Sequence, residues 1–304
     1  AARREGTASA QRSLGLLATT LATEFNHQHA LGLDLDGRLG GDFFRIGGLR
    51  VDPPNSGVSV QIDPEQVSSL TGSDYSLRYD GAAYQLTDLA TGKAVPAAQM
   101  QLSTAADGST TLRAHGLVFT GARTTLTEPT FVYPTRYTAG AIEVAITDPR
   151  DVAAATPVLA SLPATNTGSL QVQSLKLVDA GSNAAGSELN MAALNLRFDG
   201  GTRFIVGAGW SPADLAYAPA AGDASGKSFT LTGPGGIQLE LKLAGTPAAN
   251  DVVTLADNKG GVADNRNAAL LGALQTDKLM FGSGGQPTAT LNNAYAQLVA
   301  KVGS

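Results

Sequence analysis

The segment Gly260-Gly-Val-Ala-Asp-Asn-Arg-Asn-Ala-Ala-Leu-Leu-Gly-Ala-Leu274 marks the point where the chain returns from β structure to helix. The Gly260-Gly261 pair breaks the preceding strand pattern. Asp264 or Asn265 can serve as the helix cap, because either side chain can accept a free backbone N–H of the first turn. Apolar residues then recur on one helical face, at Leu270, Leu271 and Leu274.

Two further helical patterns lie towards the chain ends. In residues 9–31, apolar residues recur at spacings of three, four and four, which predicts an amphipathic helix with a narrow seam of Leu14, Leu17, Leu21 and Phe25. In residues 288–302 the spacings are four, three and four, at Leu291, Tyr295, Leu298 and Val302. Because one seam needs a partner, we expect the two chain ends to pack together as a helical bundle. Phe43 and Phe44 are expected to close this helical base as a buried plug.

Between these ends the sequence alternates with the period of two that is typical of strands. Tyr75-Ser-Leu-Arg-Tyr-Asp-Gly81 followed by Tyr84 predicts a β-hairpin with an Asp-Gly turn. Leu194-Asn-Leu-Arg-Phe-Asp-Gly200 followed by Phe204 repeats this pattern. We therefore interpret the middle of the chain as two related β modules. The alternative is convergent hairpin chemistry, because Asp-Gly turns are common.

The predicted fold is α+β and multidomain, with a helical bundle formed by both chain ends and two mainly antiparallel β modules. We expect a discontinuous helical domain of residues 1–49 and 258–304, a first β module at 50–150 and a second at 151–257. The length of 304 residues suits about two or three domains. The 36 glycines and the charged content of only 15% are typical of a turn-rich β protein.

Composition also excludes several classes of function. The net charge of −5 argues against a nucleic-acid-binding surface, which usually needs a basic face. The chain has no cysteine, so disulfides and thiolate zinc sites are excluded. No apolar run approaches the roughly 18 residues of a membrane span, and no secretory signal peptide is visible at Ala1. We therefore expect no nucleic acid and no membrane among the partners.

Residue types that carry chemistry do not converge in this sequence. His27 and His29 are two residues apart on a predicted helix and so point to different sides, whereas a helical zinc pair is spaced by four. We expect both to be surface or half-buried. The acidic stretch Asp34-x-Asp36-Gly37 to Asp42 lacks the glycine and glutamate of an EF-hand loop and is interpreted as an acidic turn. No catalytic, cofactor-binding or metal-binding residue, and no cofactor, is predicted.

Several segments together resemble the flagellar hook-associated protein 1 family, which forms the hook–filament junction of bacterial flagella. The resemblance is carried at the chain ends by Leu21-Ala-x-x-Phe-Asn26, His29, Gly32, Asp34-Leu-Asp-Gly37, Gly40-Gly-Asp-Phe-Phe44, Asp264-Asn-Arg-Asn267 and Leu291-Asn-Asn-Ala-Tyr-Ala-Gln-Leu-Val-Ala-Lys-Val-Gly303. Looser matches in the middle are Ser73 to Gly81, Tyr133-Pro-Thr-Arg136, Val144 to Asp148 and Gly245 to Asp251. The family's extreme terminal helical segments, which line the inner tube of the axial structure, are absent. The resemblance therefore implies a core fragment.

The resemblance implies a structural role and no enzymatic activity. A family member would join hook to filament through subunit–subunit packing, outside the cell and within the flagellum, after export without a cleaved signal peptide. The implied partners are the hook protein, the neighbouring hook-associated protein, further copies of the chain and an export chaperone. A helical base would then sit in the tubular wall, and the β modules would project outward.

Two alternatives come from other classes of function. An extracellular adhesin or carbohydrate-binding β protein would need an exposed aromatic platform, which only Trp210 and Tyr217 suggest. An extracellular enzyme acting on polysaccharides would need two carboxylates in one cleft, and Glu240 with Asp251 is one pair that could be considered.

Overall fold

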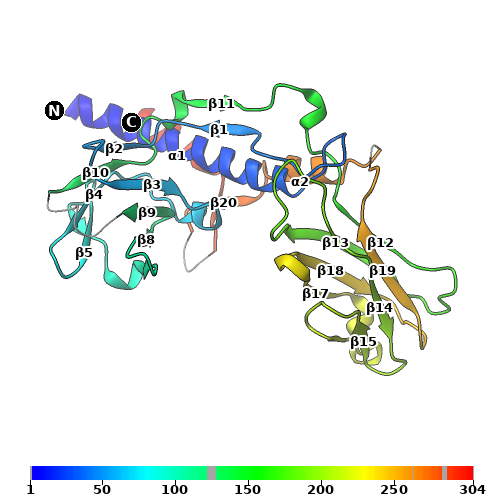
Figure 1. Cartoon of the computed structure of the whole chain (residues 1–304). Coiled ribbons are helices and arrows are strands. Elements are labelled where there is room, and N and C mark those ends of the chain that lie inside the picture. The colour runs from blue at the N-terminus through cyan, green and yellow to red at the C-terminus, as the bar shows by residue number, and fades with distance from the viewer. Residues whose placement is uncertain (1, 122–127, 262, 283–285, 304) are drawn as a thin grey trace. The chain divides into compact units, whose positions relative to one another are not determined.

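The computed structural model describes residues 2–121, 128–261, 263–282 and 286–303, with side chains from residue 6 to residue 301 within these ranges. The fold is α+β: a long N-terminal helix, antiparallel sheets and a short C-terminal helix (Figure 1). The helices are α1 (Ala2–Ala30), α2 (Arg266–Ala273) and α3 (Leu291–Gly303). None of the helices in the described ranges is long and apolar enough to cross a lipid bilayer.

The chain divides into two compact units, which interrupt each other in sequence. Unit 1 comprises residues 1–27, 43–145 and 271–304, and unit 2 comprises residues 28–42 and 146–270. The helical segments in this division belong to the same units as the β-sheets. The three-domain division at residues 49/50, 150/151 and 257/258 stays a prediction.

Unit 1 contains two main antiparallel sheets. Five strands form the first, in the order β2 (Arg50–Asp52), β10 (Thr130–Tyr133), β4 (Tyr75–Tyr79), β5 (Tyr84–Asp88) and β6 (Lys93–Ala94). Four strands form the second, in the order β3 (Val58–Ile62), β9 (Leu117–Gly121), β8 (Thr110–Ala114) and β7 (Gln101–Thr104). Two ribbons complete the unit: β1 (Phe44–Ile46) with β11 (Ile142–Val144), and β20 (Lys278–Met280) with β21 (Ala289–Thr290).

Unit 2 also contains two antiparallel sheets. The first has the order β12 (Val158–Ser161), β19 (Val252–Asp257), β14 (Leu194–Phe198), β15 (Arg203–Val206) and β16 (Asp214–Ala216). The second has the order β13 (Gln171–Asp179), β18 (Gln238–Ala244) and β17 (Lys227–Thr232). In each unit, side chains from the facing sheets form one apolar core.

The two β modules, residues 50–133 and residues 158–257, share one topology. In each five-stranded sheet the first strand of the module pairs with its last strand, and the hairpin β4–β5 or β14–β15 follows. In the smaller sheets, β3, β9 and β8 correspond to β13, β18 and β17. The repeated hairpin sequence therefore reflects a repeated strand order. The strand β7 has no counterpart in the second module.

The two hairpins use the same turn chemistry, which explains their similar sequences. Asp80 Oδ1 accepts the N–H of Ala82 at 2.9 Å, and Asp199 Oδ1 accepts the N–H of Gly201 at 2.7 Å. The glycine after each aspartate has positive φ, 95° at Gly81 and 87° at Gly200, a conformation that glycine adopts without strain. Hydrogen bonds from backbone N–H groups lower the pKa of both aspartates.

Helix α1 packs in unit 1 through a face of small and hydroxyl-bearing residues. The segment after β10 crosses the helix so closely that a Cβ on Gly15 would lie 1.6 Å from the main-chain oxygen of Thr135. The Thr138 hydroxyl donates to the main-chain oxygen of Gly15 at 3.0 Å and accepts from the Thr19 hydroxyl at 3.0 Å. The buried residues of this face are Leu16, Thr19, Thr20, Ala22 and Thr23.

This close approach predicts that Gly15→Ala lowers the free energy of unfolding by about 3 kcal/mol, because the added methyl group meets backbone that cannot move aside. Gly6→Ala in the same helix is the matched control, since nothing lies within 4 Å of a Cβ there. That change should raise stability by about 0.5 kcal/mol through the higher helix propensity of alanine. Denaturant unfolding of both variants measures the difference, and equal stabilities would contradict the packing described.

Candidate functional site

Only part of the predicted apolar seam of α1 faces the core of unit 1. Leu14 and Leu21 have exposed fractions of 47% and 41%, whereas Leu17 and Phe25 are half-buried against the core. Leu14 and Leu21 therefore do not pack in the core of their own unit, and the helical-base packing expected for them stays a prediction. The crossing segment leaves no room for a side chain at Gly15, and the face that is buried beside it carries Leu16, Ala22 and three threonines. The helix leaves two leucines one heptad apart on its open side.

Helix α3 has the same character. Ala294 is buried in the core of unit 1, and Leu291 packs against that core. Tyr295 and Val299 have exposed fractions of 56% and 52% and are four residues apart, so they share one face. The core side of α3 carries Ala294 and Leu291, and the helical-base packing expected for Tyr295 stays a prediction.

The remaining residues of the predicted C-terminal seam add one link between the chain ends. Leu298 is half-buried, and Val302 lies outside the residues whose side chains the structure describes. Lys301 Nζ donates to Ser9 Oγ at 3.0 Å and so connects α3 to α1. A bundle of both chain ends is not shown by these contacts.

The phenylalanines at the start of β1 form a half-buried aromatic cluster with α1. The ring centroids of Phe25, Phe43 and Phe44 lie 4.8 to 5.3 Å apart. The Asn26 side chain pairs with both backbone groups of Phe44: Nδ2 donates to the carbonyl at 2.7 Å, and Oδ1 accepts the N–H at 2.8 Å. The Asn26 amide therefore fixes the cluster to the helix by pairing with Phe44 as a neighbouring strand would. The three rings are half-buried, whereas the sequence predicted that Phe43 and Phe44 form a buried plug.

The start of α2 is organised by Asp264. Its Oδ1 accepts the N–H of Arg266 at 3.0 Å, and its Oδ2 accepts from Asn258 Nδ2 at 3.0 Å. Hydrogen bonds from the Arg266 guanidinium lower the pKa of Asp264. The main-chain oxygen of Asn265 accepts the first helical bond, from Ala269 at 3.0 Å. Leu274 is buried in the core of unit 1, and Leu270 is half-buried in unit 2.

A buried polar cluster in unit 2, which we call the junction, joins the end of α1 to distant segments. It consists of Gln28, His29, Gly32, Gly40, Ala153 and Asn267. His29 is fully buried, although the sequence predicted a surface or half-buried residue. Its Nε2 accepts the N–H of Ala153 at 2.8 Å, so Nδ1 carries the proton and donates to the Gly41 carbonyl at 2.8 Å. This bonding requires a neutral imidazole.

Asn267 completes the junction from the first turn of α2. Its Nδ2 donates to the Ala153 carbonyl at 2.6 Å, and its Oδ1 accepts from Gln28 Nε2 at 2.6 Å. Two glycines allow these groups to meet: a Cβ on Gly32 would lie 2.0 Å from Asn267 Nδ2, and one on Gly40 would lie 2.2 Å from the His29 carbonyl. The sequence signal for the junction was the motif that contains His29, Gly32 and Gly40, but its partners more than 100 residues away were not visible.

The electrostatics of the junction favour the neutral histidine. Burial lowers the pKa of His29 below its usual value of 6.5, although the hydrogen bond to Gly41 and the charges of Asp34 and Asp42 oppose this shift. His27, by contrast, is exposed.

Groups considered for catalysis or metal binding serve local structure. Asp34 Oδ1 accepts the N–H groups of Asp36 and Arg38, and Asp36 forms an ion pair with Arg150. Asp251 accepts three backbone N–H groups at 2.8 to 2.9 Å. Within the described ranges, no three His, Asp or Glu side chains are placed to hold a metal ion. Trp210 and Tyr217 have exposed fractions of 9% and 0%, so they offer no aromatic platform for a sugar.

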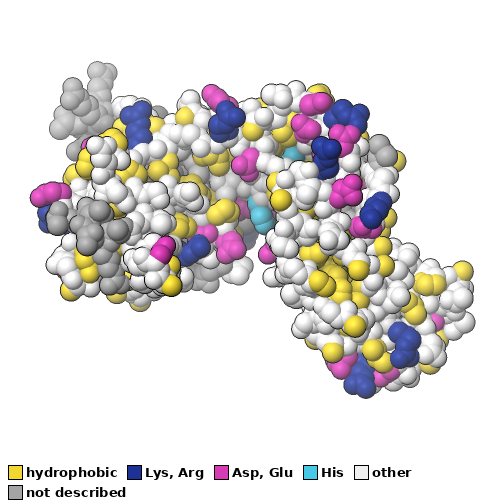
Figure 2. Space-filling model, in the orientation of Figure 1, with side chains coloured by type: hydrophobic (Ala, Val, Ile, Leu, Met, Phe, Trp, Pro, Cys, Tyr) yellow, Lys and Arg dark blue, Asp and Glu magenta, His cyan; other side chains and the backbone are white. Residues whose placement is uncertain are grey.

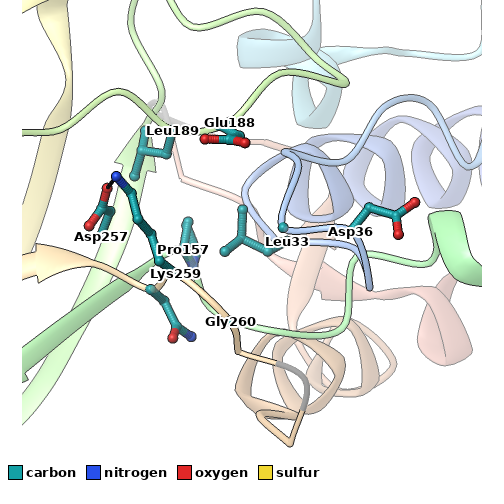
Figure 3. Close-up of a pocket in the computed structure, with 10 residues that line it drawn as sticks. Leu33, Asp36, Pro157, Glu188, Leu189, Asp257, Lys259 and Gly260 are labelled. Carbon is teal, nitrogen blue, oxygen red and sulfur yellow. Dashed lines mark ion pairs between the residues drawn. The ribbon is translucent and has the colours of Figure 1, made fainter.

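Charged side chains of both signs and one small pocket can be described in the part of the chain that the structure covers. On the face shown in Figure 2, acidic and basic side chains are interspersed. A pocket of about 180 Å³ in unit 2 is lined by Leu33, Pro157, Glu188 and Leu189, among others. Within it, Lys259 Nζ lies 3.3 Å from Asp257 Oδ2, and Asp36 points away from that pair (Figure 3).

Comparison with known proteins places this arrangement in a family. A model described as the flagellar hook-associated protein FlgK helical domain matches residues 1–44. Flagellar hook-associated protein 1 of Salmonella typhimurium is 37% identical over 81 residues, covering 25% of this chain and 15% of that protein. The Escherichia coli protein of the same name is 36% identical over 83 residues, covering 26% and 15%.

A solved structure extends the match to nearly the whole chain. The flagellar hook junction protein FlgK from Burkholderia pseudomallei matches with a TM-score of 0.76 and 30% identity, covering 97% of this chain and 55% of that chain. This chain belongs to the FlgK family of flagellar hook-associated proteins. It spans about half the length of the solved FlgK relative. Of the buried polar cluster, Gln28, His29, Gly32 and Gly40 lie within the residues 1–44 that the FlgK helical-domain model matches.

The neutral state of His29 predicts an acid-sensitive fold. Because its folded-state pKa is lowered, its contribution to stability is complete above the unfolded value and is lost as pH falls from 6.5 through the lower folded value. His29→Gln retains an acceptor for Ala153 but cannot titrate, so its unfolding free energy should fall less between pH 7 and pH 5. Burial also lowers the pKa of a second histidine, His115, so His29→Gln should keep part of the pH dependence. Identical slopes in the parent and His29→Gln would contradict this account.

The junction also predicts that Asn267→Asp destabilises the chain by about 3 kcal/mol or more, because two donors are lost and a carboxylate faces the Ala153 carbonyl. Asn265→Asp is the matched control, since this neighbouring residue is exposed and should change stability by less than about 0.5 kcal/mol. Chemical denaturation of both variants provides the measurement. A mild effect at Asn267 would show that the buried amide contributes little.

Proposed function

We propose that this chain is a structural component of the bacterial flagellum that joins hook to filament through packing between subunits. The names of its relatives, a hook-associated protein and a hook junction protein, support this role. The observation that carries the proposal is the exposed leucine seam of α1, because its own unit buries the opposite face of that helix. A helix whose leucines are exposed gains stability when another molecule covers them.

The magnitude of this gain suits an assembly of many weak contacts. Complete burial of a leucine side chain contributes roughly 1.5–3 kcal/mol, so each half-exposed apolar residue contributes about half of that. Leu14, Leu21, Tyr295 and Val299 together would contribute roughly 4 kcal/mol for each subunit. Such a value holds a subunit in place only when it is repeated around a ring or tube.

In this proposal, the helical bundle expected from the sequence forms between subunits. The exposed faces of α1 and α3 would pack against helices of neighbouring subunits, so that the bundle is completed in the assembly. The bond from Lys301 to Ser9 supports this idea because it holds the two helices in one unit. The partners would be further copies of this chain, the hook protein and the neighbouring hook-associated protein, with a chaperone during export.

The location that follows is the flagellum outside the cell, reached by export without a cleaved signal peptide. Export of an unfolded chain would suit a sequence without cysteine, because no disulfide must form afterwards. No catalysis, nucleic acid or membrane enters this role.

Substitutions on the two faces of α1 distinguish a role in assembly from a role in folding. We expect Leu21→Asp to leave the unfolding free energy within about 0.5 kcal/mol of the parent, and to abolish motility in a cell that depends on this protein for its flagella. Leu16→Asp is the matched contrast in the same helix. Leu16 is 5% exposed, so this change should cost roughly 3 kcal/mol or more through burial of a carboxylate. Normal flagella with Leu21→Asp and Leu14→Asp combined would disprove the proposed seam.

A further inference from the structure

The second β module lacks one strand that the first module has. In unit 1, β8 pairs with β7 in unbroken register, with Leu102 opposite Leu112. In unit 2, β17 occupies the position of β8, but the chain approaches it through two short 3-10 turns, Pro219–Ala221 and Asp223–Ser225. Among the strands of the described ranges, none pairs along one edge of β17.

The backbone groups along this edge point outward and are open. Gly233 N–H bonds to the Ile237 carbonyl, which sets the alternation: Leu231 and Phe229 bond to β18, whereas Thr230 and Ser228 face the free edge. Both outward residues are exposed. Neither of them has a backbone hydrogen bond on that side to any residue in the described ranges. Two rungs, with four hydrogen-bonding groups, are therefore available.

One rung of the missing strand is already in place. Ser211 and Thr232 exchange both backbone hydrogen bonds at 2.8 Å, as an isolated antiparallel bridge. The chain then continues from Ser211 into β16, and no other residue that the structure describes pairs with Thr230 or Ser228 on this side. An added strand would extend a ladder that has already begun.

This edge has less protection against strand pairing than the opposite edge of its sheet. Natural edge strands are blunted by bulges, prolines or charges. The opposite edge of the same sheet, β13, has two register shifts, between Val172 and Ser174 and between Leu177 and Asp179, and it carries Lys176. The register of β17 is continuous and the strand has no proline. Its one charged residue, Lys227, lies at the start of the strand, where its Nζ pairs with Asp223 at 2.8 Å.

The side chains at the edge indicate what the added strand should carry. Phe229 is half-buried against the core, with its ring centroid 6.4 Å from that of Tyr217. On the other face Ser228 and Thr230 are polar and exposed. An apolar residue opposite Phe229, flanked by small polar residues, would continue both faces of the sheet. β7 supplies this pattern in the first module, as Gln-Leu-Ser-Thr.

We infer that the free edge of β17 binds an extended, uncharged segment of another protein as a fourth antiparallel strand, with an apolar residue opposite Phe229. A second copy of β17 is a poor occupant. The one register that uses Ser228 and Thr230 of both copies places Gly226 of each opposite Thr232 of the other, where Ser211 already pairs. The inference goes beyond the role in assembly proposed above, because it concerns a different surface in unit 2.

The test uses the full chain and a peptide with the sequence of residues 98–105, the β7 segment, as the probe. Hydrogen exchange followed by NMR should show that saturating peptide slows the Ser228 and Thr230 amides by at least about tenfold. The amides of Phe229 and Leu231, which already bond to β18, should be unaffected. Exchange rates at Ser228 and Thr230 that do not change at millimolar peptide would overturn the inference.

Two variants at one position show whether binding uses the edge. Thr230→Pro removes the outward N–H, and an edge strand tolerates proline at such a position. Peptide affinity should fall at least about tenfold, whereas Thr230→Ala, which keeps the N–H, should bind within about twofold. Equal binding by both variants would overturn the inference. Self-association of the parent that Thr230→Pro abolishes would overturn the choice of a foreign strand. Motility does not enter these measurements, so they stand apart from the test of the α1 seam.

Discussion

The contact on which unit 1 depends is the crossing of backbone over α1 at Gly15. No side chain fits between the helix and the Thr135 carbonyl at position 15, and the face of α1 that packs beside this crossing carries Leu16, Ala22 and three threonines. Leu14 and Leu21 lie on the open side of the helix. The crossing therefore marks which face of the helix is buried and which face is left for another molecule.

The junction applies a comparable constraint in unit 2. Gly32 and Gly40 bring backbone within reach of His29 and Asn267, and these two side chains bond to the Ala153 segment. Both ring nitrogens of His29 and both amide atoms of Asn267 have hydrogen-bond partners, so these polar side chains are tolerated in a buried position and hold the segments in a specific arrangement. The histidine stays neutral because its acceptor nitrogen is already in use.

Local patterns predicted the strands well and the helix contacts poorly. The Asp-Gly turns and alternating residues of the two hairpins depend on neighbours close in sequence, so their repetition was visible without coordinates. The seam of α1 was recognised, but a period of 3.6 shows only that a face is apolar and not which molecule covers it. His29 was interpreted as surface or half-buried because its partner at Ala153 is 124 residues away, beyond the reach of any spacing rule.

The pairing of first and last strands has a consequence for how such chains can change. β2 lies beside β10, and β12 lies beside β19. The chain therefore enters and leaves each β module, here called a lobe, at adjacent points. A lobe with neighbouring ends can be exchanged for a foreign domain without displacing the framework that carries it. Related chains could thus differ in one lobe while the rest of the unit keeps its structure, and an engineer could graft a reporter or an antigen at the same two points.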